Sequence, residues 1–366
     1  MPGRLVVAKI GTSSLTDERG VIVDAAIDKL CAEVAALRTA GDRVVVVTSG
    51  AIAAGLPVLG LGDARPTDPA ILQAVSAVGQ AHLVDRYNRA LAAHGLVAGQ
   101  VLLAPLDFVN RKQYLHARQT LQVLLDLGVV PVVNENDAIA DDEIRFGDND
   151  RLAALVSHLL AADLLVLLTD QAGLLTADPR FDQQASLIEE IVAVDHSLEA
   201  RAGGAGSARG SGGMASKLAA AKIAAWSGVR AVIAAAARES VLADALAGTP
   251  GVGTVFVPRP ARLPARKLWI AFAVGASGTI VVDDGARAAL TLRSVSLLPA
   301  GVVSVQGDFD ADDAVELAGP DGKVFAKGLA RHTASVVRAL AGKRSADLPA
   351  DTSAEIVHRD DLVILP

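Results

Sequence analysis

The sequence predicts an α/β protein: a three-layer αβα sandwich with a mostly parallel sheet, followed by a small β-rich C-terminal domain. Three observations support this. Short apolar runs alternate with longer Ala-rich stretches in the first two-thirds of the chain, most of those runs are apolar throughout, and the composition changes near residue 257. The chain has 366 residues, 51% of them hydrophobic, which is enough for two or three domains with a large core.

The alternation of strand-like and helix-like segments carries the fold prediction. Six apolar runs are typical of buried strands, at residues 5–10, 44–47, 97–103, 129–133, 164–168 and 231–234. Five longer stretches predict helices, at residues 24–40, 68–93, 109–127, 149–161 and 214–227. Strands that are apolar on both faces and alternate with helices indicate a parallel sheet covered on both sides.

Composition excludes several classes of function. Aromatic residues make up only 3% of the chain, which is too few for a platform on which the bases of single-stranded nucleic acid could stack. The net charge is -7, so the protein is not suited to bind an anionic membrane surface. The single cysteine, Cys31, lies among the apolar positions of a predicted helix and is expected to fill the core. The sequence shows no targeting segment, and the apolar stretch 152–168 is interrupted by His158 and Asp163, so we expect a cytoplasmic protein without membrane spans.

A Pro- and Arg-rich segment separates the two predicted domains. Residues 258–276 are interpreted as a linker, because residues 258–267 contain three prolines and four basic residues. The predicted domains are therefore 1–257 and 277–366, the second with short strand-like runs and one helix-like stretch at 334–341.

Four predicted strands end in small, polar or charged residues. These ends are residues 9–13, 48–51, 134–137 and 169–173. Ligands of parallel α/β sheets bind outside the carboxyl ends of the strands. The four ends therefore predict a single binding site at one edge of the sheet.

The stretch 134–150 is strongly acidic. It contains seven carboxylates with Arg145 as its only basic residue. So much like charge in one loop is self-repulsive unless a cation sits there, such as an ammonium group, a metal ion or lysines from elsewhere in the chain. This loop is interpreted as part of the substrate site rather than as a solvated surface loop.

Two elements predict binding of phosphate groups. Lys9 ends the first strand and precedes Gly11, and a Gly-rich segment at 203–213 opens a helix with Lys217 in its first turn. Backbone N–H groups at a helix start and a nearby lysine suit an anion. The chain lacks a Walker P-loop and a His/Cys metal-ligand spacing. Two lysines, two Gly-rich anion sites and an acidic loop favour phosphoryl transfer, and an anionic acceptor needs no general base.

Several motifs together resemble the glutamate 5-kinase family of the amino acid kinase superfamily. They are found at residues 9–13, 47–55, 133–137, 146–150, 168–170 with 178–180, and 212–217; residues 278–286 and 296–301 resemble the start of a PUA domain. The resemblance implies an amino acid kinase fold and ATP-dependent phosphorylation of the γ-carboxylate of L-glutamate to L-glutamyl 5-phosphate. It also implies a place as the first step of proline biosynthesis, with feedback inhibition by proline.

The resemblance also assigns roles to residues of this chain. Lys9 and Lys217 would neutralise the transferring phosphoryl group, and Asp150 would hold both lysines. The implied glutamate-binding residues are Ser49, Gly50, Asn134, Asp137, Asp148 and Asn149. The implied nucleotide-binding residues are Lys9, Thr169, Asp170, Ser211, Gly212, Gly213, Met214, Ala215, Ser216 and Lys217.

Cofactors and partners follow from the same resemblance. ATP would bind with Mg²⁺, which would bridge the phosphates with few direct protein ligands, so no residues are assigned as a metal site. The family implies a homo-oligomer, a dimer or tetramer, whose product passes to a glutamyl phosphate reductase. PUA domains often bind RNA, but the turn 307–313 carries four aspartates, so we expect RNA binding to be absent here.

Two alternatives remain open from the sequence. The chain could be a sibling kinase that acts on another carboxylate, a carbamate or a nucleotide monophosphate, although the acidic loop disfavours the last. It could also be an RNA-binding or regulatory protein that retains an inactive kinase fold, although Lys9, Asp150 and Lys217 are all present.

Overall fold

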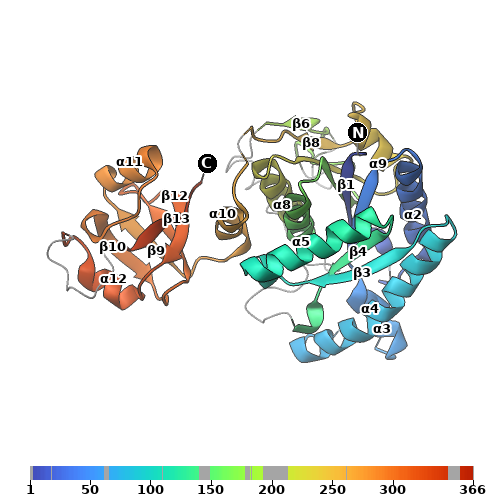
Figure 1. Cartoon of the computed structure of the whole chain (residues 1–366), viewed down its shortest axis with the longest axis horizontal. Helices are drawn as coiled ribbons and strands as arrows, with labels where there is room; N and C mark the ends of the chain where they lie inside the picture. Colours follow the sequence, from blue (N-terminus) through green and yellow to red (C-terminus); the bar gives the residue numbers. More distant parts are fainter. Residues whose placement is uncertain are drawn as a thin grey trace. The chain divides into compact units, whose positions relative to one another are not determined.

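The computed structural model divides into two compact units, unit 1 (Met1–Arg262) and unit 2 (Leu263–Pro366), both drawn in Figure 1. It describes residues 3–17, 19–61, 66–108, 110–139, 149–177, 182, 184–192, 213–260, 262–344 and 355–365. The boundary between the units lies within the segment 258–276 that the sequence predicts as a linker.

Unit 1 is built on an eight-stranded sheet in the order β3-β4-β2-β1-β5-β7-β8-β6. The strands are β1 (Leu5–Ile10), β2 (Arg43–Val47), β3 (Ala98–Leu103), β4 (Val130–Glu135), β5 (Leu164–Thr169), β6 (Glu190–Ile191), β7 (Arg230–Ala235) and β8 (Thr254–Phe256). The pairs β1–β2, β1–β5, β2–β4, β3–β4, β5–β7 and β6–β8 are parallel, and β7–β8 is antiparallel. The prediction of a mostly parallel sheet is confirmed.

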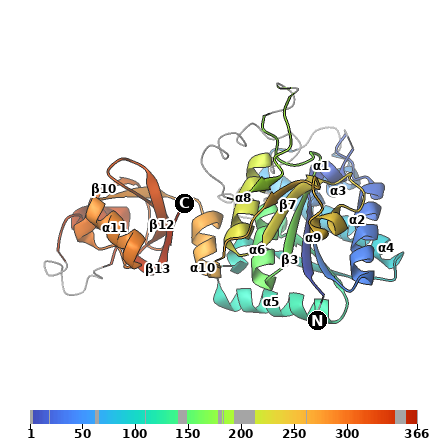
Figure 2. The same cartoon turned by 90° about the horizontal axis from the view of Figure 1, so that it is seen from above.

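Helices cover both faces of this sheet. They are α1 (Thr12–Leu15), α2 (Asp24–Thr39), α3 (Ala51–Val58), α4 (Pro69–Ala92), α5 (Arg111–Asp126), α6 (Asn149–Leu160), α8 (Met214–Trp226) and α9 (Val241–Ala247), with 3₁₀ turns η1 (Pro105–Phe108) and η2 (Asp137–Ile139). Figure 2 shows α6 and α8 on one side of the sheet and α2 and α4 on the other. The sequence analysis did not predict α1, α3, α9, β6 or β8, which are short elements of two to eight residues.

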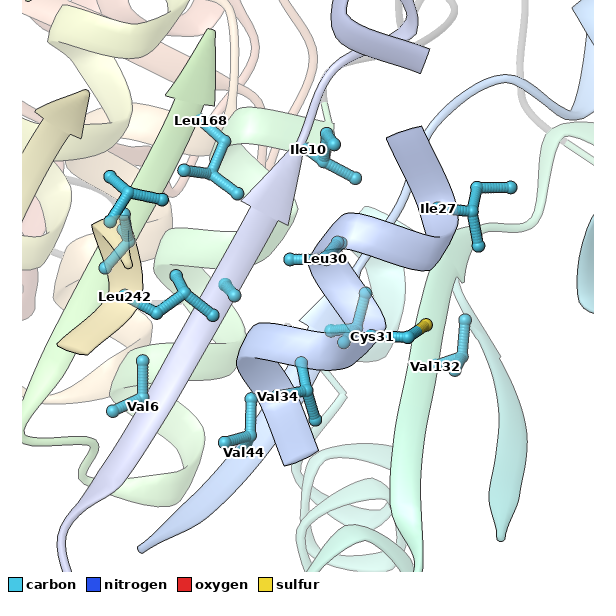
Figure 3. Packing of buried hydrophobic residues seen from close by; sticks show 14 of the residues in the cluster. Val6, Ile10, Ile27, Leu30, Cys31, Val34, Val44, Val132, Leu168 and Leu242 are labelled. Atoms are coloured by element: carbon cyan, nitrogen blue, oxygen red, sulfur yellow. The ribbon is translucent and has the colours of Figure 1, made fainter. Parts of the chain in front are cut away.

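The side-chain alternation along β1 decides which residue reaches which face. Val6, Ala8 and Ile10 belong to the core cluster on the α2 side, together with Cys31 of α2, as Figure 3 shows for Val6, Ile10 and Cys31. The prediction that Cys31 fills the core is confirmed, because its side chain is fully buried. Successive side chains of a strand point to opposite faces, so Lys9 projects to the face that α6 covers.

Unit 2 contains a five-stranded sheet in the order β10-β9-β11-β12-β13. Its elements are α10 (Ala265–Leu268), the π-helical turn η3 (Trp269–Ala273), β9 (Gly278–Val282), α11 (Asp284–Arg293), the 3₁₀ turn η4 (Pro299–Gly301), β10 (Val302–Gly307), β11 (Ala314–Ala318), β12 (Val324–Ala330), α12 (Ala334–Leu340) and β13 (Val357–Ile364). The prediction of a small β-rich domain is confirmed.

Two parts of unit 2 differ from the sequence prediction. The helix α11 was not predicted; Asp283 begins it by accepting a hydrogen bond from the backbone N–H of Ala286. Part of the predicted linker is helical and packed, because Leu268 and Ile270 are buried and Arg266 forms an ion pair with Asp361 at 2.5 Å. A Pro- and Arg-rich composition is typical of linkers, but it does not reveal these tertiary contacts.

None of the helices in the described part of the chain combines the length and the hydropathy that crossing a membrane requires.

Candidate active site

Three charged side chains from distant parts of unit 1 meet in its interior. The Lys9 ammonium lies 2.5 Å from Oδ1 of Asp150, and the Lys217 ammonium lies 3.3 Å from Oδ2 of the same carboxylate. The hydroxyl of Ser216 donates to Oδ2 at 2.6 Å. Lys9, Asp150 and Lys217 are only 3%, 1% and 4% exposed, so their charges act on each other without much screening by water.

Each of these residues lies at the end of a regular element. Lys9 is near the carboxyl end of β1, Asp150 is the second residue of α6, and Lys217 is in the first turn of α8. The two helices pack against each other. Every residue of α6 except Arg151 is buried, and its first turn places Asp150 between Lys9 and Lys217.

The charge state of Asp150 follows from two opposing effects. Burial raises the pKa of Asp150, but the two neighbouring ammonium groups outweigh this and lower its pKa to about 2. Asp150 is therefore ionised at neutral pH. One carboxylate thus holds two ammonium groups at the carboxyl edge of the sheet, where a phosphate group could approach both.

The start of α8 offers further groups for an anion. Its N-cap is Gly213, which has no side chain that could accept a hydrogen bond from the first N–H groups of the helix, and no acidic residue lies in the first turn. The free N–H groups of a helix start suit a phosphate. Thr169 is buried and donates its hydroxyl to the exposed Asp170 at 3.0 Å. Of the predicted nucleotide residues, Ser211 and Gly212 lie outside the described residues, and Met214 and Ala215 occupy the first turn of α8.

A cavity of about 410 Å³ opens beside the carboxyl ends of β1 and β5. Its lining includes Thr169 and Asp170 together with Ser14, Lys29 and Ala236, and among the described residues Lys9, Asp150 and Lys217 do not line it. The cavity therefore adjoins the predicted nucleotide residues without containing the three charged groups.

A second buried carboxylate lies on the substrate side. Asp137, in η2, is 7% exposed and accepts a hydrogen bond at 2.8 Å from the hydroxyl of Ser76 in α4. Burial raises the pKa of Asp137, and the Ser76 hydrogen bond partly offsets the rise. Within the described residues no lysine or arginine forms an ion pair with Asp137. A buried carboxylate of this kind is suited to an ammonium group of a ligand.

Polar side chains next to Asp137 form a buried network. The side-chain amide of Asn134 donates to Oε1 of Gln80 at 2.7 Å. The side-chain oxygens of Asn134 and Asn149 both accept from the backbone N–H of Glu135, at 2.9 Å and 3.0 Å. The structure thus brings Asn134 and Asn149 together. Asp148 lies outside the described residues, as do all of residues 140–148 of the acidic stretch 134–150.

The turn at Ser49 and Gly50 follows β2 at the same edge of the sheet. Gly50 has φ = +100°, a conformation that a residue with a side chain adopts only with strain. Thr48 stabilises this turn, because its hydroxyl lies 2.8 Å from the buried hydroxyl of Tyr87 and 3.1 Å from the carbonyl oxygen of Ser49.

Three residues of α4 were missed by the sequence analysis: Ser76, Gln80 and Tyr87. Ser76 and Gln80 are one turn apart on the buried face of the helix, so they share that face. The signal available in the sequence was that Ser76 and Gln80 are polar residues on a helix face that is otherwise mostly apolar. Their partners, Asp137 and Asn134, lie 61 and 54 residues away along the chain, which no local pattern could show.

Comparisons with known proteins show the family of the chain. Residues 4–235 match the model of the amino acid kinase family and residues 278–350 match that of the PUA domain. The glutamate 5-kinase of Pelobacter propionicus is 44% identical over 364 residues, which is 98% of this chain and 97% of that protein. The chain belongs to the glutamate 5-kinase family. The glutamate 5-kinase of Burkholderia multivorans is 45% identical over 366 residues, covering 99% of this chain and 98% of that protein.

Membership of the glutamate 5-kinase family confirms the resemblance found in the sequence. A solved structure, the carbamate kinase from Giardia lamblia bound to AMP-PNP, aligns with a TM-score of 0.50 at 19% identity, over 70% of this chain and 99% of that chain; this likeness concerns the fold alone. The roles of individual residues stay predictions. Among the described residues no cluster of three His, Cys, Asp or Glu side chains is placed to hold a metal ion.

Proposed function

We propose that the protein transfers the γ-phosphoryl group of ATP to the γ-carboxylate of L-glutamate and forms L-glutamyl 5-phosphate, the first step of proline biosynthesis. The observation that carries this proposal is the pair of buried lysines joined by Asp150, in a chain whose relatives over nearly its full length are glutamate 5-kinases.

The three charged residues would act on the transferred group. The bond between the γ-phosphorus and the ADP oxygen breaks while a bond forms to a carboxylate oxygen of glutamate, and no proton needs to be removed from that oxygen. Lys9 and Lys217 stabilise the negative charge on the phosphoryl oxygens, and Asp150 keeps both ammonium groups in place. The start of α8 at Gly213 receives phosphate oxygens.

The second buried carboxylate would recognise the amino acid. Asp137 pairs with the α-ammonium of glutamate, while Ser49, Gly50, Asn134, Asp148 and Asn149 surround the rest of the substrate. A nucleotide monophosphate would bring its own negative charge close to Asp137, so the site favours an acceptor that carries an ammonium group.

Further parts of the proposal concern cofactor and partners. Mg²⁺ supplies charge neutralisation on the ATP phosphates, with few direct protein ligands. Proline acts as a feedback inhibitor, the product passes to a glutamyl phosphate reductase, and the protein works in the cytoplasm without binding RNA. The proposal includes a homo-oligomer, a dimer or tetramer.

The test of the proposed reaction is a hydroxylamine trap. The full chain is incubated with ATP, Mg²⁺ and L-glutamate, with and without proline, and γ-glutamyl hydroxamate is measured. Hydroxamate that decreases when proline is added supports both the reaction and the inhibition. ADP release that depends on glutamate but yields no hydroxamate would mean that a different atom accepts the phosphoryl group.

Asp137→Ala is expected to raise the KM for glutamate by about 100-fold, with the KM for ATP changed by less than about threefold, because it removes a charged partner of the substrate ammonium. Steady-state kinetics with each substrate varied in turn measures this. Asp170→Ala, at an exposed position of the predicted nucleotide set, is the matched control and should act on ATP instead. An Asp137→Ala effect confined to ATP would contradict the assignment of Asp137.

Ser76→Ala is expected to make glutamate binding more sensitive to acid. The Ser76 hydroxyl stabilises the ionised form of Asp137, so its loss raises the pKa of Asp137 further. Because the ionised form binds the substrate ammonium, KM for glutamate should increase as the pH falls, and in Ser76→Ala this increase should begin at a higher pH than in the wild type. KM measured between pH 8 and pH 5 tests the shift; coincident profiles would show that Ser76 does not act on Asp137.

A further inference from the structure

The two helices that carry Asp150 and Lys217 are held by one short segment at their opposite ends. α6 and α8 both begin at the carboxyl edge of the sheet and lead into β5 and β7 respectively, and they pack side by side, as Figure 2 also shows. They contain 12 and 13 residues, so their ends lie roughly 18–20 Å apart. Arg259 contacts the C-terminal end of α8, and Arg262 contacts that of α6.

Arg259 holds the end of α8. Its guanidinium lies 4.0 Å from the centre of the Trp226 ring, and Trp226 is the last residue of that helix. The backbone N–H of Arg259 donates to the carbonyl oxygen of Ala225 at 2.8 Å. A guanidinium over an indole ring is a favourable cation–π contact, so the end of α8 is fixed both by backbone and by side chain.

Arg262 holds the end of α6. Its guanidinium donates to the carbonyl oxygen of His158, which lies in the last turn. The same carbonyl also accepts the backbone N–H of Ala161 at 3.2 Å. Carbonyl groups at a helix C-terminus carry partial negative charge, so a guanidinium stabilises them. Burial and the charge of Arg262 lower the pKa of His158 to about 4, so the imidazole is neutral at neutral pH and does not repel the guanidinium.

We infer that Arg259 and Arg262 are positioning residues for phosphoryl transfer: they fix the C-terminal ends of α8 and α6 and so hold Lys217 and Asp150 in the geometry that the reaction requires. This inference rests on the proposed function. Most residues of the two helices are buried and the helices pack on each other, so a shift at one end moves the charged residues at the other. Misplacement of a catalytic group by about 1 Å can cost on the order of 100-fold in rate.

The chain offers a matched control at a third helix. Arg230 donates to the carbonyl oxygens of Ala245 and Leu246, at 2.7 Å and 3.1 Å, near the C-terminal end of α9. This is the same kind of contact as that of Arg262, but α9 carries none of the predicted site residues. Loss of Arg230 therefore removes a helix-end contact without disturbing Asp150 or Lys217.

The experiment compares Arg259→Ala, Arg262→Ala, Arg262→Lys and Arg230→Ala in the full chain. We expect Arg262→Ala and Arg259→Ala each to lower kcat by about tenfold, with both KM values changed by less than about threefold. Arg262→Lys should recover part of the rate, since a lysine can still donate to the carbonyl of His158. Arg230→Ala should lower the melting temperature to a similar extent and leave kcat within about twofold of the wild type.

A second measurement does not depend on turnover. Amide hydrogen exchange of the unliganded protein should become faster at residues 149–152 and 214–218 in Arg262→Ala and Arg259→Ala, and only around α9 in Arg230→Ala. Equal kcat losses in Arg262→Ala and Arg230→Ala, or unchanged exchange at both helix starts, would overturn the inference. A wild-type protein that forms no glutamyl phosphate would refute the proposed function instead, and exchange would still decide whether the arginines hold the two helix starts.

Discussion

Lys217→Ala is expected to reduce kcat by about 1,000-fold, because it removes one of the two buried ammonium groups that would stabilise charge on the transferring phosphoryl group. The loss should appear in kcat and in kcat/KM alike, since this charge develops most strongly in the transition state. The stability of the fold should change little. Asp150 keeps the ammonium of Lys9 at 2.5 Å and the hydroxyl of Ser216 at 2.6 Å, so the carboxylate remains paired.

A lysine of the same helix provides the control for this prediction. Lys222 lies five residues after Lys217 in α8 and is half-buried, and Lys222→Ala should leave kcat within about twofold of the wild type. Thermal unfolding of both variants separates catalytic from structural effects. If Lys217→Ala and Lys222→Ala had the same kinetics, Lys217 would have no part in phosphoryl transfer.

The main architecture of the fold could be predicted because its strands are buried on both faces. The run 164–168 corresponds to β5 (Leu164–Thr169), which is fully buried, and the parallel pairing follows from the helices between such runs. Short elements carry too few residues for a periodic pattern. β6 has only two residues, and α3 has eight, which include Gly55 and Pro57. These elements form because residues that lie next to them in space, but not in sequence, stabilise them.

The site could be predicted in part for a similar reason. Lys9 and Lys217 lie at the ends of strongly patterned elements, where parallel sheets place their ligands. Gln80 and Arg262 could not be found in this way. Gln80 acts on Asn134 across 54 residues, and the partner of Arg262 is a backbone carbonyl, which leaves no mark on the sequence. The Pro- and Arg-rich composition around Arg262 pointed to a linker instead.

Asp150→Asn is expected to have the largest combined effect on rate and stability. An amide carries no charge to hold Lys9 and Lys217, so both ammonium groups lose the carboxylate that orients them, and kcat should decrease by about 1,000-fold. Removing the one carboxylate that two buried ammonium groups share typically costs about 3–5 kcal/mol in the free energy of unfolding. Asp85→Asn, which removes a carboxylate of an exposed pair with Arg89, should cost less than about 1 kcal/mol and serves as the control.

The pH dependence of this loss identifies its cause. The folded-state pKa of Asp150 is lowered to about 2 from an ordinary value of 3.8, so its ionised form contributes stability that is fully present above about pH 4 and disappears as the pH falls towards 2. Of the difference between wild type and Asp150→Asn, about 2–3 kcal/mol should therefore be lost over this range. Urea unfolding at pH 7, 4 and 2 measures the change. A difference that stays constant or widens as the pH falls would mean that packing, and not the charge of Asp150, holds the two lysines and the helices that carry them.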